Sequence, residues 1–272
     1  AEPDPGRQEG PAPAAQGVGK RLMQVPRFVI SDVDETLLGD DDSLAVLTET
    51  LKRNRDDLAF GIATGRNRTL SEQLCEEHDL PEFDVIICSI GTEILYGPER
   101  VPDRGWQRHI SYQWKRDGII EVMTTLSDRG VEPQEDNAQT PLKLSYYTEA
   151  ALSPDDVAEI HRRLCAARLR YNLIYSKDCY LDLIPFRASK GKALRYLSYK
   201  WNTPLSNFVA CGNSGNDADM FGGDVCGVVV GNYAPELEPL RGRRKIYFAD
   251  ASFAEGILEG LRHYEFIAPE GV

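Results

Sequence analysis

Short apolar runs that end in polar residues recur along this chain, and they constrain its fold more than any other feature. Between the runs lie stretches with helical periodicity, an alternation typical of βαβ units and a parallel sheet. The carboxyl ends of parallel strands meet at one edge of a sheet, so residues that follow different runs converge there. The pattern predicts a doubly wound α/β core with a site at that edge. The runs and the polar segments after them are 27–31 with 32–37, 58–63 with 64–66, and 207–211 with 212–217.

The first run ends in two acids, Asp32 and Asp34, within the string DVDETL. Residues i and i+2 of an extended segment point to the same face, so both carboxylates are directed at one region. Like charges this close repel, and a hard cation such as Mg²⁺ relieves the repulsion by binding their oxygens. On its own the pair fits a metal-assisted site, but it also fits a helix cap beside an exposed charge.

The residues predicted to converge with this pair favour the metal-assisted site. Thr64 follows the second run, Lys190 opens an amphipathic stretch, and Asp217 follows the last run. Two acids, a hydroxyl, a lysine and a further acid can together hold a phosphate and its metal. A carboxylate can then accept the phosphoryl group as a nucleophile, and the anionic transition state needs cationic stabilisation.

At these positions the chain resembles the haloacid dehalogenase superfamily of phosphohydrolases, whose four motifs occur here in the same order. From about Phe28 to Phe266 it resembles, more narrowly, sucrose-phosphate phosphatases and the matching C-terminal domain of sucrose-phosphate synthases. The resemblance implies a Rossmann-like core. The strings that carry it are ISDVDETLLGD, IATGR, SIGTEI, LKLSYY, YLDLIPFRASKGKALRYL, CGNSGNDADM and EGILEGLRHYEF.

The resemblance also implies a role for each residue of the predicted site. Asp32 would be the nucleophile that becomes an aspartyl phosphate, and Asp34 would be the general acid and base. Thr64 would hold the phosphate, and Lys190 would supply positive charge to it. Mg²⁺ would be the cofactor, bound by Asp32, the main-chain carbonyl of Asp34, Asn213 and Asp217.

One position departs from the family pattern. These phosphatases usually have GDSGND where this chain has GNSGND, so Asn213 stands where an acid is expected. An amide carbonyl can still coordinate a hard cation, but it brings no negative charge. We therefore expect weaker Mg²⁺ binding, which Asn213→Asp should strengthen. The alternative is a neutral turn residue in a site that has lost its activity.

Residues 107–184 are richer in strands and lie between two parts of the predicted core, 27–106 and 185–272. This organisation is typical of an inserted αβ cap, which can close over a substrate and exclude water. The expected elements of the cap are strands at 142–147, 170–175 and 179–184, a helix-like stretch at 114–129, and a helix from Ser153 to Arg168.

The candidate sugar-binding residues lie in the cap and at its junctions. Lys143 alternates with apolar neighbours in LKLSYY, so it should project from the opposite face and could donate to a sugar hydroxyl. A solvent-exposed lysine would show the same pattern. Glu93 and Arg187, near the two junctions, are further candidates. The other predicted substrate-binding residues are Thr64, Gly65, Asn216 and Arg66, and Arg66 could equally pair with a carboxylate of the core.

The composition excludes several classes of partner. The formal net charge of −12 disfavours nucleic acid and anionic membranes, because both are bound through clustered Lys and Arg. No apolar stretch approaches the ~20 residues of a membrane span, and no secretory signal is found, so we expect a cytoplasmic protein. Residues 1–26 are rich in Pro, Gly and charge, which predicts a flexible linker or tail.

The predicted function is a Mg²⁺-dependent phosphohydrolase that acts on sucrose 6-phosphate or a close disaccharide phosphate. A phosphatase for a related sugar, such as a mannosyl or glucosyl glycoside phosphate, is a second interpretation. A third is a non-catalytic regulatory or scaffolding domain of a sucrose-phosphate synthase, with a fused or associated glycosyltransferase domain as partner. The intact Asp32, Asp34 and Lys190 favour an enzyme, and Asn213 keeps the third interpretation open.

Overall fold

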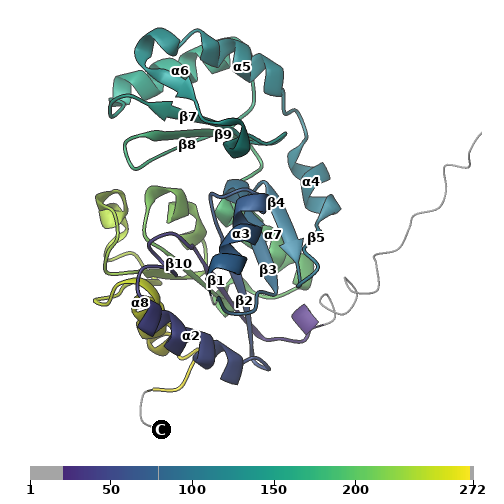
Figure 1. Cartoon of the computed structure of the whole chain (residues 1–272), viewed down its shortest axis with the longest axis vertical. Helices are drawn as coiled ribbons and strands as arrows, with labels where there is room; N and C mark the ends of the chain where they lie inside the picture. The colour runs from purple at the N-terminus through teal and green to yellow at the C-terminus, as the bar shows by residue number, and fades with distance from the viewer. Residues whose placement is uncertain (1–20, 79, 270–272) are drawn as a thin grey trace, which may run out of the picture.

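The computed structural model describes residues 21–78 and 80–269, and their strands form two separate sheets (Figure 1). Within these residues the larger sheet has eight strands in the order β12-β11-β10-β1-β2-β3-β4-β5. Neighbours from β12 to β3 are parallel, and β4 and β5 are antiparallel additions at one edge. This order confirms the predicted doubly wound α/β core. The strands are β1 (Arg27–Ser31), β2 (Leu58–Ala63), β3 (Val85–Cys88), β4 (Glu93–Tyr96), β5 (Val101–Pro102), β10 (Phe208–Gly212), β11 (Cys226–Val229) and β12 (Ile246–Phe248).

Helices cover both faces of the larger sheet. Successive strand residues alternate between the faces, so Phe28 and Ile30 pack in the same cluster as α4 and α7, whereas Val29 packs with α2, α3 and α8. A parallel sheet covered on both faces buries nearly every strand residue, which explains the continuous apolar runs in the sequence. The helices are α2 (Asp41–Arg53), α3 (Arg68–Glu77), α4 (Arg104–Ile110), α7 (Lys190–Trp201) and α8 (Phe253–His263).

Helix α7 begins at the ends of the central strands. The side chain of Ser189 caps it by accepting a hydrogen bond from the backbone N–H of Lys192 at 3.0 Å. Lys190 is therefore the first residue of the helix. At the other end, Asn202 adopts the left-handed conformation, with φ of 52°, that commonly ends helices.

The smaller sheet lies above the larger one in Figure 1 and has the strand order β6-β7-β9-β8. Helices α5 and α6 pack on one of its faces around a separate apolar cluster. The helix predicted to begin at Ser153 does so, with a capping box between Ser153 and Asp156. The helix-like stretch expected at 114–129 is shorter. The elements are α5 (Arg116–Thr124), β6 (Val131–Pro133), β7 (Leu144–Thr148), α6 (Pro154–Ala166), β8 (Asn172–Ser176) and β9 (Tyr180–Ile184).

Two segments connect the sheets, and they contact one another. The guanidinium of Arg187, on the returning segment, lies 4.4 Å from the ring centroid of Tyr112, on the outgoing one. Arg187 also donates to the main-chain oxygen of His109 at 3.3 Å. A cation–π contact and a hydrogen bond therefore join the two segments.

The packing at the predicted boundaries differs from the sequence-based division. Residues 1–20 lie outside the described residues. Leu22 is fully buried and Arg21 pairs with Asp84 at 2.9 Å, so residues assigned to the tail pack against the core. Ile110 also belongs to a core cluster, beyond the expected boundary at 106. Among the helices of residues 21–78 and 80–269, none has the length and apolar character that a membrane crossing requires.

Candidate active site

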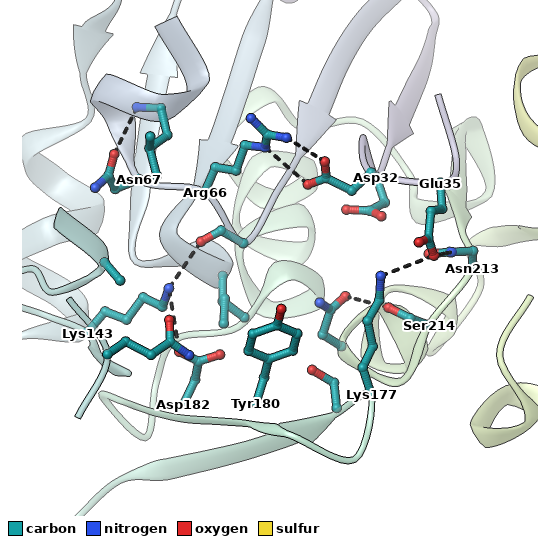
Figure 2. A pocket seen from close by; sticks show the side chains of 18 of the residues that line it. Asp32, Glu35, Arg66, Asn67, Lys143, Lys177, Tyr180, Asp182, Asn213 and Ser214 are labelled. Atoms are coloured by element: carbon teal, nitrogen blue, oxygen red, sulfur yellow. Dashed lines mark hydrogen bonds and ion pairs between the residues drawn. The ribbon is translucent and has the colours of Figure 1, made fainter. Parts of the chain in front are cut away.

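A cavity of about 600 Å³ lies between the carboxyl ends of the central strands and the smaller sheet (Figure 2). The strands β1 and β10 are neighbours, and the chain winds away from them in opposite directions. Such a switch point leaves a crevice at the strand ends, where open α/β folds bind ligands. The predicted site residues that line the cavity are Asp32, Asp34, Gly65, Arg66, Lys143, Asn213 and Asn216.

Lys190 joins two acids on the core side of the cavity. Its Nζ donates to Asp32 Oδ1 and to Asp217 Oδ1, each at 2.7 Å, and to Asn216 Oδ1 at 3.0 Å. Lys190 and Asp217 are fully buried, and Asp32 is 5% exposed. When both carboxylates are ionised, the one ammonium between them leaves a net negative charge away from water, which a cation would stabilise.

Burial and neighbouring charges shift the protonation equilibria of this cluster. Burial raises the pKa of Asp32 to about 7, and the charge of Asp217 adds to the rise while Lys190 opposes it. Burial lowers the pKa of Lys190, but the carboxylates of Asp217 and Asp32 outweigh burial and raise it above its ordinary value. Lys190 therefore stays charged. A divalent cation beside Asp32 would lower the pKa of that carboxyl again.

Asp34 and Thr64 lie next to this cluster. Arg66 holds Asp34 through two hydrogen bonds, from Nη2 to Oδ1 at 2.7 Å and from Nε to Oδ2 at 3.2 Å. The Asp34 side chain is still 45% exposed, so it can reach a ligand in the cavity. Thr64 is fully buried, and its Oγ1 accepts a hydrogen bond from the backbone N–H of Arg66 at 3.1 Å. The sequence left two partners open for Arg66, a ligand or a carboxylate of the core. In the structure Arg66 pairs with a core carboxylate, that of Asp34.

The predicted cation ligands include an oxygen without a partner. Asn213 is 2% exposed, and its Oδ1 accepts no hydrogen bond in the structure. Asp217 Oδ2 accepts from the backbone N–H groups of Asn213 and Ser214, each at 3.1 Å, which fixes this loop. A buried carbonyl oxygen without a partner, in the same cavity as Asp32, suits Mg²⁺. The residues present therefore fit the cation.

Half of the predicted cation ligands are neutral oxygens. The described residues hold no group of three or more His, Cys, Asp or Glu side chains placed to bind a metal ion. The predicted set has only two acidic side chains, those of Asp32 and Asp217, beside the Asn213 amide and a main-chain carbonyl. Hard cations accept such neutral oxygens as ligands.

The smaller sheet presents a second polar cluster towards the cavity. The apolar residues on either side of Ser145 pack against α5 and α6, so Ser145 faces the other way, opposite Asp182 in the sheet register. Ser145 Oγ donates to Asp182 Oδ1 at 2.6 Å. Lys143 Nζ lies 3.5 Å from the same oxygen and donates to the main-chain oxygen of Gly65 at 3.2 Å. Because Lys143 is only 6% exposed, the interpretation as a solvent-exposed lysine is wrong.

Besides the fully buried Thr64, two predicted substrate-binding residues, Glu93 and Arg187, do not line the cavity. Glu93 is the first residue of β4 and accepts a hydrogen bond from Cys88 Sγ at 3.8 Å. Arg187 stacks on Tyr112 between the two connecting segments. Nearness to a junction in the sequence does not fix the direction of a side chain, and both residues are directed elsewhere. We therefore leave Glu93 and Arg187 out of the proposed substrate contacts.

Three charged residues line the cavity that sequence analysis did not identify: Glu35, Lys177 and Asp182. Asp182 lies between the fully buried Leu181 and Leu183, and an acid inside an apolar strand is a signal that could have been used. Glu35 and Lys177 lie in turns, with φ of 60° and 51°. No local pattern predicts where such side chains point.

The sheet order, the acids after β1 and the lysine at the start of α7 define the haloacid dehalogenase class of fold. A haloacid dehalogenase-like hydrolase protein from Bacillus subtilis shares it, with a TM-score of 0.64 and 18% identity over 90% of this chain and 94% of that one. A sucrose-phosphatase from Synechocystis, solved with sucrose and phosphate, has a TM-score of 0.83 and 31% identity over 90% of this chain and 100% of that one.

The chain belongs to the sucrose-6F-phosphate phosphohydrolase family, whose model matches residues 25–265. Probable sucrose-phosphatase 2 of Arabidopsis thaliana is 34% identical over 90% of this chain and 61% of its own length. Mannosylfructose-phosphate phosphatase of Agrobacterium fabrum is 32% identical over 89% of this chain and 98% of its own length. The chain thus spans less than two thirds of the plant relative. The family predicted from the sequence is confirmed.

Proposed function

We propose that this protein is a Mg²⁺-dependent phosphohydrolase that removes phosphate from sucrose 6-phosphate or a close disaccharide phosphate through an aspartyl phosphate. The observation that carries the proposal is the buried Asp32–Lys190–Asp217 cluster beside a cavity of about 600 Å³ whose lining includes several charged side chains. A cavity of this volume lies within the range that small-molecule sites occupy. The family and the relatives named phosphatases support the same reaction.

In the first half of the reaction, the Asp32 carboxylate attacks phosphorus and the bond from phosphorus to the sugar oxygen breaks. Asp34, protonated, gives its proton to the leaving sugar oxygen. In the structure both Asp34 oxygens accept hydrogen bonds from Arg66. We propose that Arg66 turns to the phosphoryl oxygens when substrate enters, which releases Asp34 to carry a proton.

In the second half, the Asp34 carboxylate takes a proton from water as the water attacks the aspartyl phosphate. The bond from phosphorus to Asp32 breaks, and inorganic phosphate and the Asp32 carboxylate are restored. Lys190, which donates to Asp32 at 2.7 Å, would stabilise the transferring group, and Thr64, whose Oγ1 accepts from the backbone N–H of Arg66, would hold the phosphate. Preorganised charge at such positions is a large contribution to phosphoryl transfer.

The proposed cation ligands are Asp32, the main-chain carbonyl of Asp34, Asn213 and Asp217. When bound, Mg²⁺ would neutralise the phosphoryl oxygens and fix their orientation. The unpartnered, buried Oδ1 of Asn213 supports this assignment.

We propose that residues 107–184 act as a cap that selects the sugar. Lys143 and Asp182 provide a donor and an acceptor on the wall opposite Asp32, and Ser145 fixes Asp182. A sugar hydroxyl both donates and accepts hydrogen bonds, so a lysine beside a carboxylate suits it. Lys143 also contacts the main chain of Gly65 in the core, which ties the cap to the phosphate end of the cavity.

Two alternative functions are also compatible with the observations. The similarity to a mannosylfructose-phosphate phosphatase favours a related disaccharide phosphate as substrate as much as sucrose 6-phosphate. A regulatory domain of a sucrose-phosphate synthase, beside a glycosyltransferase partner, would keep the fold without turnover. The paired acids and Lys190 favour catalysis, because a domain without turnover does not need two buried carboxylates around one lysine.

The test is phosphate release from a panel of sugar phosphates, with and without Mg²⁺. We expect disaccharide phosphates to be hydrolysed faster than glucose 6-phosphate, and a chelator to stop the reaction. Hydrolysis that continues after thorough metal removal would contradict the proposed cofactor. No release from any sugar phosphate at millimolar Mg²⁺ would favour the regulatory domain.

A further inference from the structure

Glu35 connects the loop that contains Asn213 to the smaller sheet (Figure 2). Its Oε2 accepts a hydrogen bond from Asn213 Nδ2 at 3.2 Å and another from Lys177 Nζ at 3.1 Å. It directly follows Asp34 and lines the same cavity. None of the proposed chemical steps uses it.

The backbone of Glu35 is held in a conformation that few residues adopt. Its φ of 60° lies in the left-handed region, which is uncommon for a residue other than glycine. The side chain of Asn232 donates to the main-chain oxygen of Glu35 at 2.7 Å and accepts from the N–H of Phe253 at 3.1 Å. The direction of the Glu35 side chain is therefore set by contacts on both sides of it.

The two ends of the Asn213 amide have opposite requirements. The Nδ2 end donates hydrogen bonds and the Oδ1 end accepts them, whereas a carboxylate only accepts. Glu35 therefore requires the nitrogen end to face it, because the reverse orientation would place Oδ1 against a carboxylate oxygen. The Oδ1 end is then left buried and without a partner, as observed.

We infer that Glu35 is a positioning residue for the cation site: it orients the Asn213 amide so that Oδ1, and not Nδ2, is offered to the cation. This inference rests on the proposed function only in taking Mg²⁺ as the cation. An amide turned the other way would present N–H groups, which repel a cation instead of binding it. Glu35 and Asn213 thus act as one unit.

A carboxylate at position 213 would not need to be oriented by Glu35. Its two oxygens are equivalent, so either orientation offers a ligand to the cation. The effect of removing Glu35 should therefore depend on the residue at 213. If Glu35 contributed only its charge, its removal would weaken cation binding equally with Asn or Asp at 213.

The experiment measures the Kd for Mg²⁺ by titration calorimetry on the whole chain without substrate, in the four forms made by Glu35→Leu and Asn213→Asp. We expect Glu35→Leu to weaken Mg²⁺ binding about tenfold with Asn213 and less than about threefold in the Asn213→Asp form. Glu35→Gln keeps an acceptor and should recover most of the loss. Glu35→Ala is a second truncation, and thermal unfolding without Mg²⁺ checks that each form folds.

Lys177→Met is the matched control, because it removes the other partner of the same Glu35 oxygen. We expect it not to weaken Mg²⁺ binding. An equal loss from Lys177→Met and Glu35→Leu would show that contact with the smaller sheet, and not the amide, is responsible. Equal losses from Glu35→Leu with Asn and Asp at 213, no loss with Asn, or no Mg²⁺ binding by the unmodified chain would each overturn the inference.

Phosphate release, measured separately on the same variants, distinguishes this inference from the proposed function. Dependence of the Glu35 effect on residue 213 without hydrolysis of any sugar phosphate would support the inference and reject the proposed function. Hydrolysis of a sugar phosphate, together with a Glu35 effect that is the same for Asn and Asp at 213, would support the proposed function and reject the inference.

Discussion

The two walls of the cavity each contain a buried lysine beside an acid, and the difference between them matches the two tasks proposed for the pocket. On the core wall, Lys190 lies 2.7 Å from both Asp32 and Asp217. On the wall formed by the smaller sheet, Lys143 lies 3.5 Å from Asp182, which also accepts from Ser145. With its acids ionised, the core cluster carries a net negative charge, whereas one lysine and one acid on the other wall balance.

This difference in charge suits different ligands. A buried negative cluster attracts a cation, which in turn can hold a phosphoryl group. A neutral pair of donor and acceptor suits hydroxyl groups, which carry no charge. In the proposed function, the same two residue types would serve phosphate chemistry on one wall and sugar selection on the other, because the number of carboxylates around the lysine differs.

The largest expected effect comes from Asp32→Asn on the core wall. An amide cannot attack phosphorus as a carboxylate does, so we expect turnover to fall by about 10⁴-fold or more. The assay is hydrolysis of a small aryl phosphate, which does not need the sugar wall. Asp182→Asn is the control and should retain most of this activity. Substantial hydrolysis by Asp32→Asn would rule out the aspartyl phosphate.

Exchange of each lysine for methionine compares the stability that the two walls require. Lys190→Met leaves Asp32 and Asp217 buried without a counter-charge, and we expect the free energy of unfolding to fall by about 3–5 kcal/mol. Lys143→Met leaves one acid that keeps its hydrogen bond from Ser145, so a loss of about 1–2 kcal/mol is expected. Urea unfolding without Mg²⁺ measures both. Equal losses would mean that the walls do not differ in this way.

Lys143→Ala should separate sugar selection from phosphate chemistry. We expect KM for the preferred sugar phosphate to rise about tenfold while hydrolysis of a small aryl phosphate changes less than about twofold. Lys245→Ala is the matched control, because Lys245 is a partly buried lysine that pairs with Asp224 and does not line the cavity. If both substrates lose equally, Lys143 does not contact the sugar.

The smallest effect is expected for the ion pair that joins the walls. The side chains of Lys177 and Glu35 are 37% and 60% exposed, so water screens their attraction. We expect their coupling to contribute less than about 1 kcal/mol to the free energy of unfolding, and less still at high salt. A double-mutant cycle of Lys177→Met and Glu35→Gln measures it. A coupling free energy well above this value would mean that the ion pair is less exposed to solvent than the structure indicates.

Local sequence was enough to predict the core of the fold and the core wall of the cavity. The runs around β1, β2 and β10 are apolar because both faces of the sheet are covered, and Asp32, Thr64 and Asp217 follow them. Parallel strands end at one edge, so such residues meet whatever lies between them. Ser189 and Ser153 mark helix starts by capping, which depends only on neighbouring residues.

The wall formed by the smaller sheet depends on tertiary structure. Lys177 and Glu35 meet although 142 positions separate them, because a turn of the smaller sheet is placed over a turn of the core. Lys143 is buried for the same reason, and Arg187 packs on Tyr112 between the connecting segments. The direction of a side chain in a turn depends on the packing of whole units, and no local periodicity records that packing. The sequence determined that Asn213 is an amide, and only the fold determined which of its two ends is free.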